Sequence, residues 1–166
     1  MKSIVAVDSL RGIGKNNDLL FDLPSDMKFF RTKTLNKVIV MGSNTLKSFP
    51  NGNPLKNRTN IVLYPNGEKR EDCIIVDSLD ELREELKKYP TDDIYIVGGA
   101  MFYKTMLPYC DTAYITKVNA DGNATVFYEN LDLMSDWQCV DSTDDIEENN
   151  LLFRFTTYKN NNIQPF

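Results

Sequence analysis

The stretch Ile94-Tyr95-Ile96-Val97-Gly98-Gly99-Ala100-Met101-Phe102 joins an apolar run to a helical pattern through two adjacent glycines. Its first four residues form a continuous apolar run, as expected for a strand that is covered on both faces. The segment Ala100–Leu107 has helical spacing, begins directly after the glycines and stops at Pro108. This stretch therefore predicts a buried strand that turns at once into a helix.

Apolar runs and helical patterns alternate in the same way along most of the chain. Further strands are expected at Ile4–Val7, Val38–Met41, Asn60–Leu63, Cys73–Val76, Ala113–Val118 and Leu151–Tyr158. Helices are expected at Ser25–Leu35, Ser43–Phe49 and Leu79–Lys88, the first of them capped by Ser25. The alternation up to about residue 110 predicts an open, mostly parallel α/β sheet. The final strands have no helix between them, so we expect an antiparallel hairpin at one edge.

Length and composition predict one domain. The chain has 166 residues, of which 42% are apolar, and it contains no repeat or low-complexity linker. We expect a single domain over residues 1–159 and a frayed tail over residues 160–166.

Charge and residue usage exclude several classes of function. The 19 basic and 24 acidic residues give a net charge of −5, which makes nucleic acid and anionic membranes poor partners. The absence of histidine excludes histidine bases, Ser-His-Asp systems and histidine-containing zinc sites. The three cysteines form no C-x-x-C motif, which favours small core residues in a reducing compartment. The apolar run that ends before Asp8 is too short for a signal peptide, so we expect a cytoplasmic protein.

Three strand ends are rich in small residues and are candidate ligand sites. Ligands of open α/β sheets bind at the carboxyl ends of the strands. Asp8 to Asp22 carries two glycines and is long and poor in helical pattern, which predicts a mobile lid. Met41–Thr45 and Ile96–Phe102 lead from a strand into a helix through glycine, which lets backbone N–H groups approach a phosphate. Each junction could also be an ordinary turn, but two in one sheet favour a dinucleotide.

Two polar residues have both a structural and a functional interpretation, and a third has only a structural one at this level. Asp26 could be a surface carboxylate at a helix start, or, among Phe21, Leu23, Met27, Phe29 and Phe30, an acid with a raised pKa that holds a proton. Arg58 could be a solvated loop charge or a bidentate clamp on a substrate carboxylate. Thr116 could be an ordinary strand residue.

Taken together, these residues resemble the dihydrofolate reductase family over about residues 3 to 158. The resemblance rests on short motifs in a distinctive order. They are Ile4-Val5-Ala6, Gly12–Asn17, Leu23–Phe30, Thr34–Lys37, Val40–Thr45, Leu55–Leu63, Ile96–Tyr103 and Tyr114-Ile115-Thr116. The family implies a central mixed, mostly parallel eight-stranded sheet flanked by about four helices, with an antiparallel C-terminal hairpin at one edge.

The resemblance also implies an activity, a cofactor and partners. It implies NADPH-dependent reduction of 7,8-dihydrofolate to tetrahydrofolate, with hydride passing to C6 and a water-relayed proton to N5, assisted by Asp26. It places the enzyme in tetrahydrofolate biosynthesis and one-carbon metabolism. It implies dihydrofolate and antifolate-type small molecules as ligands, a monomer, and no metal.

The family motifs assign further residues to the two ligands. Those implied to contact substrate are Ile4, Val5, Ala6, Met27, Phe30, Phe49, Leu55, Arg58, Val97, Tyr103 and Thr116. Those implied to contact cofactor are Ala6, Ile13, Gly14, Asn17, Leu19, Gly42, Ser43, Asn44, Thr45, Leu63, Tyr64, Gly98, Gly99, Ala100, Met101, Phe102, Tyr103 and Thr125. Gly98-Gly99 resembles the family's cis glycyl pair.

Some positions depart from the family pattern. Ser43 stands where a basic residue often grips the cofactor's 2′-phosphate, a role that Lys15, Lys47 or Lys69 could take over. Ala124 stands where the family usually has an aspartate that anchors the lid, so we expect the lid over residues 12–22 to close less firmly.

Two alternatives remain at this level. A related pterin or pyrimidine reductase would share the glycine junctions, but lacks the carboxylate before two phenylalanines and the Arg58 clamp. A non-catalytic pterin- or nucleotide-binding module would not need Asp26, Arg58 and Thr116 together.

Overall fold

The computed structural model describes all 166 residues and contains eleven strands and four α-helices. The strands are β1 (Lys2–Val7), β2 (Gly12–Gly14), β3 (Val38–Gly42), β4 (Thr59–Leu63), β5 (Ile74–Val76), β6 (Ile94–Ile96), β7 (Thr112–Val118), β8 (Val126–Phe127), β9 (Trp137–Ser142), β10 (Ile146–Glu148) and β11 (Leu151–Asn160). The helices are α1 (Pro24–Thr34), α2 (Ser43–Ser48), α3 (Leu79–Leu86) and α4 (Ala100–Met106). Short 3-10 turns cover Pro50–Gly52, Thr91–Asp93, Leu107–Tyr109 and Leu131–Leu133.

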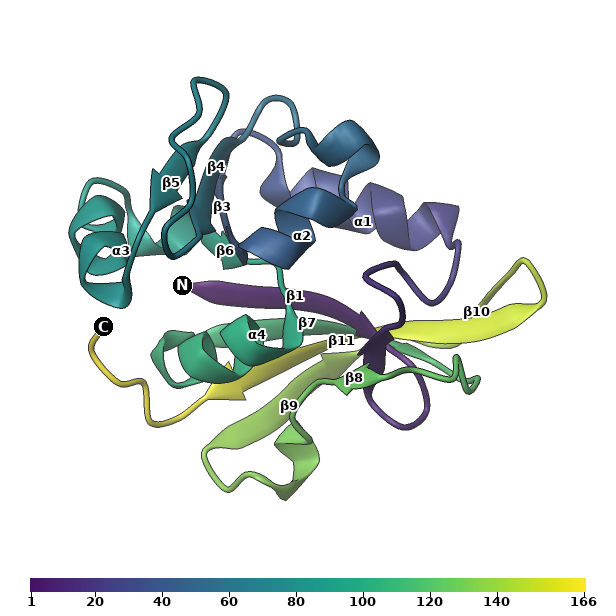
Figure 1. Cartoon of the computed structure of the whole chain (residues 1–166). Helices are drawn as coiled ribbons and strands as arrows, with labels where there is room; N and C mark the ends of the chain where they lie inside the picture. Colours follow the sequence, from purple (N-terminus) through teal and green to yellow (C-terminus); the bar gives the residue numbers. More distant parts are fainter.

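One mixed sheet runs through the molecule (Figure 1), in the order β10-β11-β7-β1-β6-β3-β4-β5. All pairings from β7 to β5 are parallel, whereas β11 pairs antiparallel with β7, β9 and β10. The predicted α/β class, the parallel majority, the four helices and the antiparallel C-terminal strands are confirmed. β2 and β8 form a separate two-stranded sheet.

The sheet has nine strands rather than the expected eight. The additional pairing arises from the length of β11, whose two ends pair with different strands on the same side. Phe153 near its start lies opposite Ile146 of β10, and Asn160 at its end lies opposite Trp137 of β9. The register shifts between Thr157 and Tyr158.

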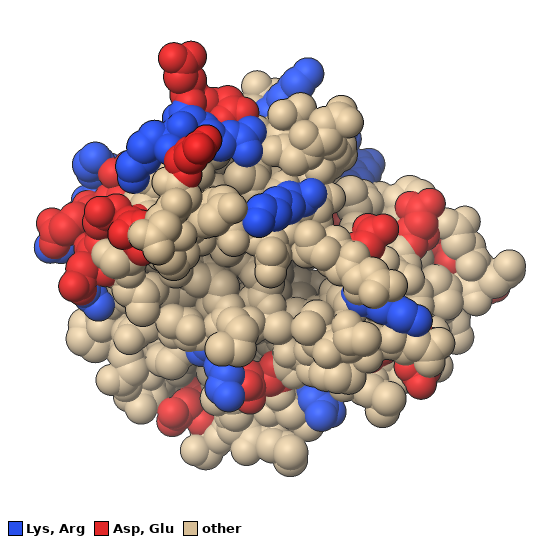
Figure 2. All heavy atoms as spheres, viewed as in Figure 1, with Lys and Arg blue, Asp and Glu red and all other residues tan.

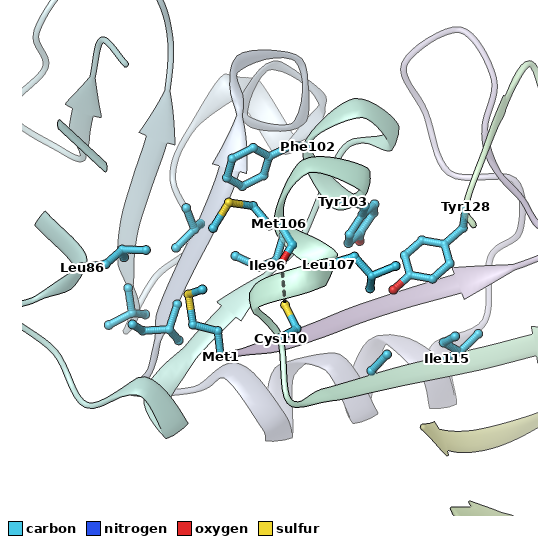
Figure 3. Close-up of a cluster of buried hydrophobic side chains, with 14 of the residues drawn as sticks. Met1, Leu86, Ile96, Phe102, Tyr103, Met106, Leu107, Cys110, Ile115 and Tyr128 are labelled. Atoms are coloured by element: carbon cyan, nitrogen blue, oxygen red, sulfur yellow. Dashed lines mark hydrogen bonds between the residues drawn. The ribbon is translucent and has the colours of Figure 1, made fainter. Parts of the chain in front are cut away.

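Two apolar clusters hold the helices against the two faces of the sheet. One contains Leu82 and Leu86 of α3 together with Phe102 and Met106 of α4 (Figure 3). The other contains Leu46 of α2, with Phe29 and Phe30 of α1 packed against it. The strands between these clusters are the continuous apolar runs of the sequence, because both of their faces are covered.

The start of α1 differs from the expected Ser25 cap. The N-cap position is Leu23, which offers no side-chain acceptor, and Pro24 occupies the first turn. Proline is suited to this position because its missing N–H would have no partner there. Ser25 instead donates hydrogen bonds to Glu148.

Residues 160–166, for which we expected a frayed tail, make contacts with the body of the protein. The Asn160 side chain donates to the Cys110 carbonyl oxygen at 3.0 Å, and the Gln164 N–H donates to the Pro108 carbonyl oxygen at 2.9 Å. The Phe166 ring lies 4.9 Å from the Tyr109 ring between centroids. The tail therefore has an ordered path beside the turn that precedes β7. No helix reaches the length and apolar character that a membrane crossing requires.

Candidate active site

Asp26 lies in the first turn of α1 and is half-buried between that helix and the sheet. Its Oδ1 accepts a hydrogen bond of 2.7 Å from the hydroxyl of Thr116, a buried residue of β7. This contact joins residues 90 positions apart in the chain. Two of the three polar candidates therefore lie together, and Thr116 is more than an ordinary strand residue.

Burial raises the pKa of the Asp26 carboxyl above its ordinary value, because a charged carboxylate loses solvation there. The hydrogen bond from Thr116 acts in the opposite direction, and the negative charge of Glu148 raises the pKa further. Asp26 forms no salt bridge with any lysine or arginine. A carboxyl in this environment is suited to holding a proton.

Asp26 faces the carboxyl ends of the central parallel strands. Thr116 lies opposite Ala6 of β1 in the register of β7 and β1. The hydroxyl of Tyr103, on α4, donates to the Ile4 carbonyl oxygen at 2.7 Å, which ties α4 to the same part of β1. Ligands of open α/β sheets bind at this position.

The two glycine junctions lie side by side next to these strands. β3 and β6 are parallel neighbours, and the Gly42 N–H donates to the Gly98 carbonyl oxygen at 2.9 Å. The Gly98–Gly99 peptide bond is cis, which confirms the expected cis pair. Gly98 has a φ of +136°, and a Cβ there would lie 2.8 Å from the Thr45 Oγ1. Glycine residues therefore leave the backbone without side chains of its own at the neighbouring ends of β3 and β6.

Figure 2 shows a hollow near the centre of this face, between α2 above and α4 and β8 below, with few charged side chains on its walls. The expected substrate-contacting side chains come from the elements around it. Ile4 is buried, Phe30, Phe49 and Leu55 are half-buried, and Met27 is 52% exposed. Apolar side chains of this kind next to the half-buried Asp26 carboxyl suit a flat heteroaromatic ring.

Arg58 lies on the loop before β4, where its guanidinium is held by two acceptors. Nε donates to the Lys56 carbonyl oxygen at 2.9 Å, and one terminal nitrogen donates to the Thr34 hydroxyl at 3.2 Å. Burial and the nearby Arg31 lower the pKa of Arg58. The side chain is fixed rather than solvated, and it has no carboxylate partner within the protein.

Comparison with known proteins identifies the family. The sequence model of dihydrofolate reductase matches residues 1–160. The dihydrofolate reductase of Bacillus subtilis is 34% identical over 164 residues, covering 96% of this chain and 94% of the relative. That of Haemophilus influenzae is 33% identical over 135 residues, covering 81% of each chain. The chain belongs to the dihydrofolate reductase family. Members of this family are NADP-dependent oxidoreductases.

A solved structure of the same family has the same fold. Dihydrofolate reductase from Enterococcus faecalis, complexed with NADP(H) and RAB-propyl, superposes with a TM-score of 0.85 at 29% identity. The match covers 96% of this chain and 95% of that one.

In this reductase, the segment after β1 pairs with the segment after β7. β2 pairs with β8, and the Thr125 N–H donates to the Gly14 carbonyl oxygen at 2.9 Å. Ile13 packs against the larger apolar cluster, whereas Asn17 and Leu19 are exposed. Of the expected cofactor-contacting residues in this segment, Ile13 and Gly14 are thus packed against the body of the protein, whereas Asn17 and Leu19 are exposed.

Asp8 is a buried carboxylate that the sequence pattern does not single out. Its side chain is buried and accepts hydrogen bonds from three backbone N–H groups, those of Leu10 at 2.9 Å, Gly12 at 2.7 Å and Gly122 at 3.0 Å. It therefore joins the segment after β1 to the segment after β7. Its position directly after a strand, before a glycine-containing loop, was the available signal.

The family's anchoring aspartate is absent at position 124, and both the buried Asp8 carboxylate and the Ala124 side chain lie close to Gly12. A Cβ at Gly12 would lie 2.3 Å from the Ala124 Cβ and 2.8 Å from an Asp8 carboxylate oxygen. Ala124 therefore packs directly against the loop that Asp8 holds. An aspartate at position 124 would bring a second negative charge next to Asp8.

The remaining cofactor candidates lie on α2, β4 and α4. Ser43 and Asn44 begin α2, whose N-cap, Gly42, makes no side-chain capping bond. Leu63 and Tyr64 follow at the end of β4, and the Lys47 ammonium lies 5.0 Å from the centroid of the Tyr64 ring. On α4, Phe102 and Tyr103 are buried, Ala100 is half-buried, and Met101 is 79% exposed. Of the lysines considered for the 2′-phosphate, Lys69 donates to the Ile75 carbonyl oxygen at 2.7 Å, whereas Lys47 has no anionic partner.

Proposed function

We propose that this site reduces 7,8-dihydrofolate to 5,6,7,8-tetrahydrofolate with NADPH, with hydride delivered to C6 and a water-relayed proton to N5. The observation that carries the proposal is the half-buried Asp26 carboxyl, which accepts a hydrogen bond from the Thr116 hydroxyl. Its product places the enzyme in tetrahydrofolate biosynthesis and one-carbon metabolism.

Asp26 binds the pterin and supports its protonation. Its carboxylate accepts hydrogen bonds from the pterin amino group and N3, and Thr116 orients the carboxylate through its 2.7 Å hydrogen bond. Because burial raises the pKa of Asp26, the group holds a proton at higher pH than an exposed aspartate. The proton reaches N5 through water with Asp26 assisting, and Asp26 is left as the carboxylate that binds the pterin amino group and N3.

The backbone around the glycine junctions fits a dinucleotide. Gly98 has a φ of +136°, and a Cβ there would lie 2.8 Å from the Thr45 Oγ1, so this turn requires glycine and keeps its backbone open to a ligand. When bound, NADPH supplies the hydride. We assign the cofactor to Ala6, Ile13, Gly14, Asn17, Leu19, Gly42, Ser43, Asn44, Thr45, Leu63, Tyr64, Thr125 and the stretch from Gly98 to Tyr103.

The pterin and benzoyl rings occupy the apolar walls and the glutamate tail extends to Arg58. We assign the substrate to Ile4, Val5, Ala6, Met27, Phe30, Phe49, Leu55, Arg58, Val97, Tyr103 and Thr116. The same surfaces accept antifolate-type molecules, which share the flat ring and its amino groups.

Replacing Arg58 by glutamine is expected to raise KM for dihydrofolate by about 10–100-fold while kcat changes little. The Lys56 carbonyl oxygen and the Thr34 hydroxyl hold the guanidinium in place. Because it forms no salt bridge within the protein, its charge is available to bind a substrate carboxylate. Steady-state kinetics with dihydrofolate and with a dihydropterin that lacks the glutamate measures the effect. The truncated substrate is the control, because it has no carboxylate for Arg58 to bind and its KM should not change. An equal rise in KM for both substrates would contradict the clamp.

Replacing Lys47 by glutamine is expected to weaken NADPH binding by about 3–10-fold and NADH binding much less. Lys47 extends over Tyr64 without an anionic partner, one helical turn after Ser43, so its charge is available to a 2′-phosphate. Fluorescence titration of both dinucleotides measures the ratio of the two affinities. Lys104→Gln, on the exposed side of α4, is the matched control. An unchanged NADPH-to-NADH ratio would remove Lys47 from the cofactor site.

The absorbance of NADPH in the presence of dihydrofolate tests the proposed function directly. Turnover with dihydrofolate but not with pyrimidine or simple pterin substrates supports a folate reductase. Turnover of the other substrates alone would favour a related pterin or pyrimidine reductase, and binding without turnover would favour a non-catalytic module.

We further propose a cytoplasmic monomer. All three cysteines are free, and burial raises the pKa of the Cys110 thiol to about 12, which keeps it an unreactive core residue. Light scattering coupled to size-exclusion chromatography tests the monomer, for which the expected mass is 19.1 kDa.

A further inference from the structure

The first turn of α1 has no capping side chain of its own. Leu23 at the N-cap offers no acceptor, and Pro24 has no N–H. The N–H groups of a first helical turn have no partner within the helix and need one from elsewhere. Asp26, the candidate catalytic residue, lies in this turn. The group that completes the turn therefore also fixes the position of Asp26.

The missing acceptor comes from the far end of the chain. Glu148, the last residue of β10, receives a 2.9 Å hydrogen bond from the Ser25 N–H on one carboxylate oxygen and a 2.5 Å hydrogen bond from the Ser25 hydroxyl on the other. The contact spans 123 positions of sequence. The neighbouring Asn149 side chain donates to the Asp22 carbonyl oxygen at 3.0 Å, just before α1. The hairpin of β10 and β11 thus forms hydrogen bonds both to the first turn of α1 and to the residue just before the helix.

We propose that Glu148 is a positioning residue for Asp26, which it holds in register with Thr116 by closing the first turn of α1 through both hydrogen bonds from Ser25. This inference rests on the proposed function, because it gives Glu148 its role through Asp26. Glu148 itself does not touch the substrate.

The charge of Glu148 also acts on the proton that Asp26 carries. The hydrogen bonds from Ser25 lower the pKa of Glu148, so it keeps its negative charge to lower pH than an ordinary glutamate. Its negative charge disfavours a second one nearby and raises the pKa of Asp26 beyond the effect of burial. The other groups facing Asp26 are Thr116 from β7, which lowers its pKa, and Tyr103 from α4, whose own pKa is raised so far by burial that it stays neutral.

Glu148→Gln tests the proposal with little change of shape. The amide oxygen can still accept one bond from Ser25, but the negative charge is lost. The pKa of Asp26, read from the pH dependence of the hydride-transfer rate, is expected to fall by about 0.3–1 unit. At pH values above that pKa, the rate should then be about two- to tenfold lower with KM for NADPH unchanged, since fewer molecules carry the proton.

Glu147→Gln is the matched control. It removes the same charge from the adjacent residue of β10, whose side chain points to the opposite face of the strand and makes no bond to α1. Its pH profile should match that of the unmodified protein. Glu148→Ala, which removes both acceptors, should lower kcat more than Glu148→Gln does.

Two failures are distinguishable when Asp26→Asn is measured in parallel. If Asp26→Asn retains both turnover and the pH dependence, the proposed function of Asp26 fails. If Asp26→Asn loses the pH-dependent limb but Glu148→Gln and Glu147→Gln behave alike, Glu148 has no positioning role and only this inference is overturned.

Discussion

Replacing Asp26 by asparagine is expected to lower turnover with dihydrofolate at pH 7 by about 10²–10⁴-fold. Asparagine has nearly the same shape, and its amide oxygen can still accept the 2.7 Å hydrogen bond from Thr116. It can neither carry a negative charge against the pterin amino group nor hold a proton. The loss should therefore fall on the chemical step, while affinity for NADPH stays within about twofold. Single-turnover kinetics and cofactor titration measure the two quantities.

The pH dependence provides an independent test of the same residue. Because burial raises the pKa of Asp26, the protonated form persists to higher pH than in an exposed aspartate. The hydride-transfer rate of the unmodified protein should fall as the pH rises through this pKa. Asp26→Asn has no proton to lose and should show no such limb.

Stability separates this effect from misfolding. A group whose pKa is raised on folding binds more protons in the folded state, so its contribution to stability is present at low pH and declines as the pH rises through the folded pKa. Above that range, Asp26→Asn removes a poorly solvated charge and should melt no lower than the unmodified protein. A variant that loses turnover and also melts well below it at pH 7 would indicate a structural role for Asp26.

The sequence could predict those parts of the fold in which the local pattern and the tertiary environment agree. Runs such as Val38–Met41 became central strands because they are apolar on both faces. The glycines of Gly98-Gly99 marked the turn correctly because no side chain fits beside Thr45. These features could be predicted from the local sequence because each depends mainly on residues that are close in the chain.

The edge strands could not be predicted in the same way. β9 has five exposed residues after Trp137, and β10 has none that is fully buried. Such segments have no apolar pattern, and only pairing with the long β11 makes them strands. The additional ninth strand follows from that pairing.

In the candidate site, too, contacts between residues distant in sequence could not be predicted from local patterns. The Asp26 and Thr116 pair was available only through the family resemblance, since nothing local links two residues on different elements. Glu148 and the long-range contact of Asp8 were missed because each involves a backbone N–H distant in sequence, that of Ser25 in one case and that of Gly122 in the other. Ser25 was assigned as a cap because serine is a preferred cap residue, but Pro24 shifted the helix start so that Ser25 needs an acceptor itself.

Replacing Asp8 by alanine is expected to lower the free energy of unfolding by about 2–4 kcal/mol, because buried N–H groups lose charged acceptors. Asp8 is 3% exposed, and its two oxygens serve the N–H groups of Leu10, Gly12 and Gly122. For a chain of this size, the melting temperature should fall by about 5–15 °C. Thermal denaturation followed by circular dichroism measures the change.

The matched control for this substitution is Asp121→Ala. Asp121 lies in the same loop as Gly122, but its side chain is exposed and accepts a single hydrogen bond, from the Asn123 N–H at 2.9 Å. Asp121→Ala should lower the free energy of unfolding by no more than about 0.5 kcal/mol. Asp8→Asn should fall between the two, because an amide keeps one acceptor oxygen for three donors.

The same substitution should slow catalysis if Asp8 anchors the lid as well as the fold. Without Asp8, the segment after β1 keeps its pairing with β8 and the hydrogen bond from the Ser9 N–H to the Ala120 carbonyl oxygen, but it loses the side-chain contact to Gly122. Loss of a fixed closed position is expected to lower the hydride-transfer rate by about 10–100-fold at a temperature where Asp8→Ala is still folded. A variant that is destabilised but transfers hydride at the normal rate would restrict Asp8 to a role in stability. In that case, the β2 and β8 pairing with Thr125 would be sufficient to position the lid.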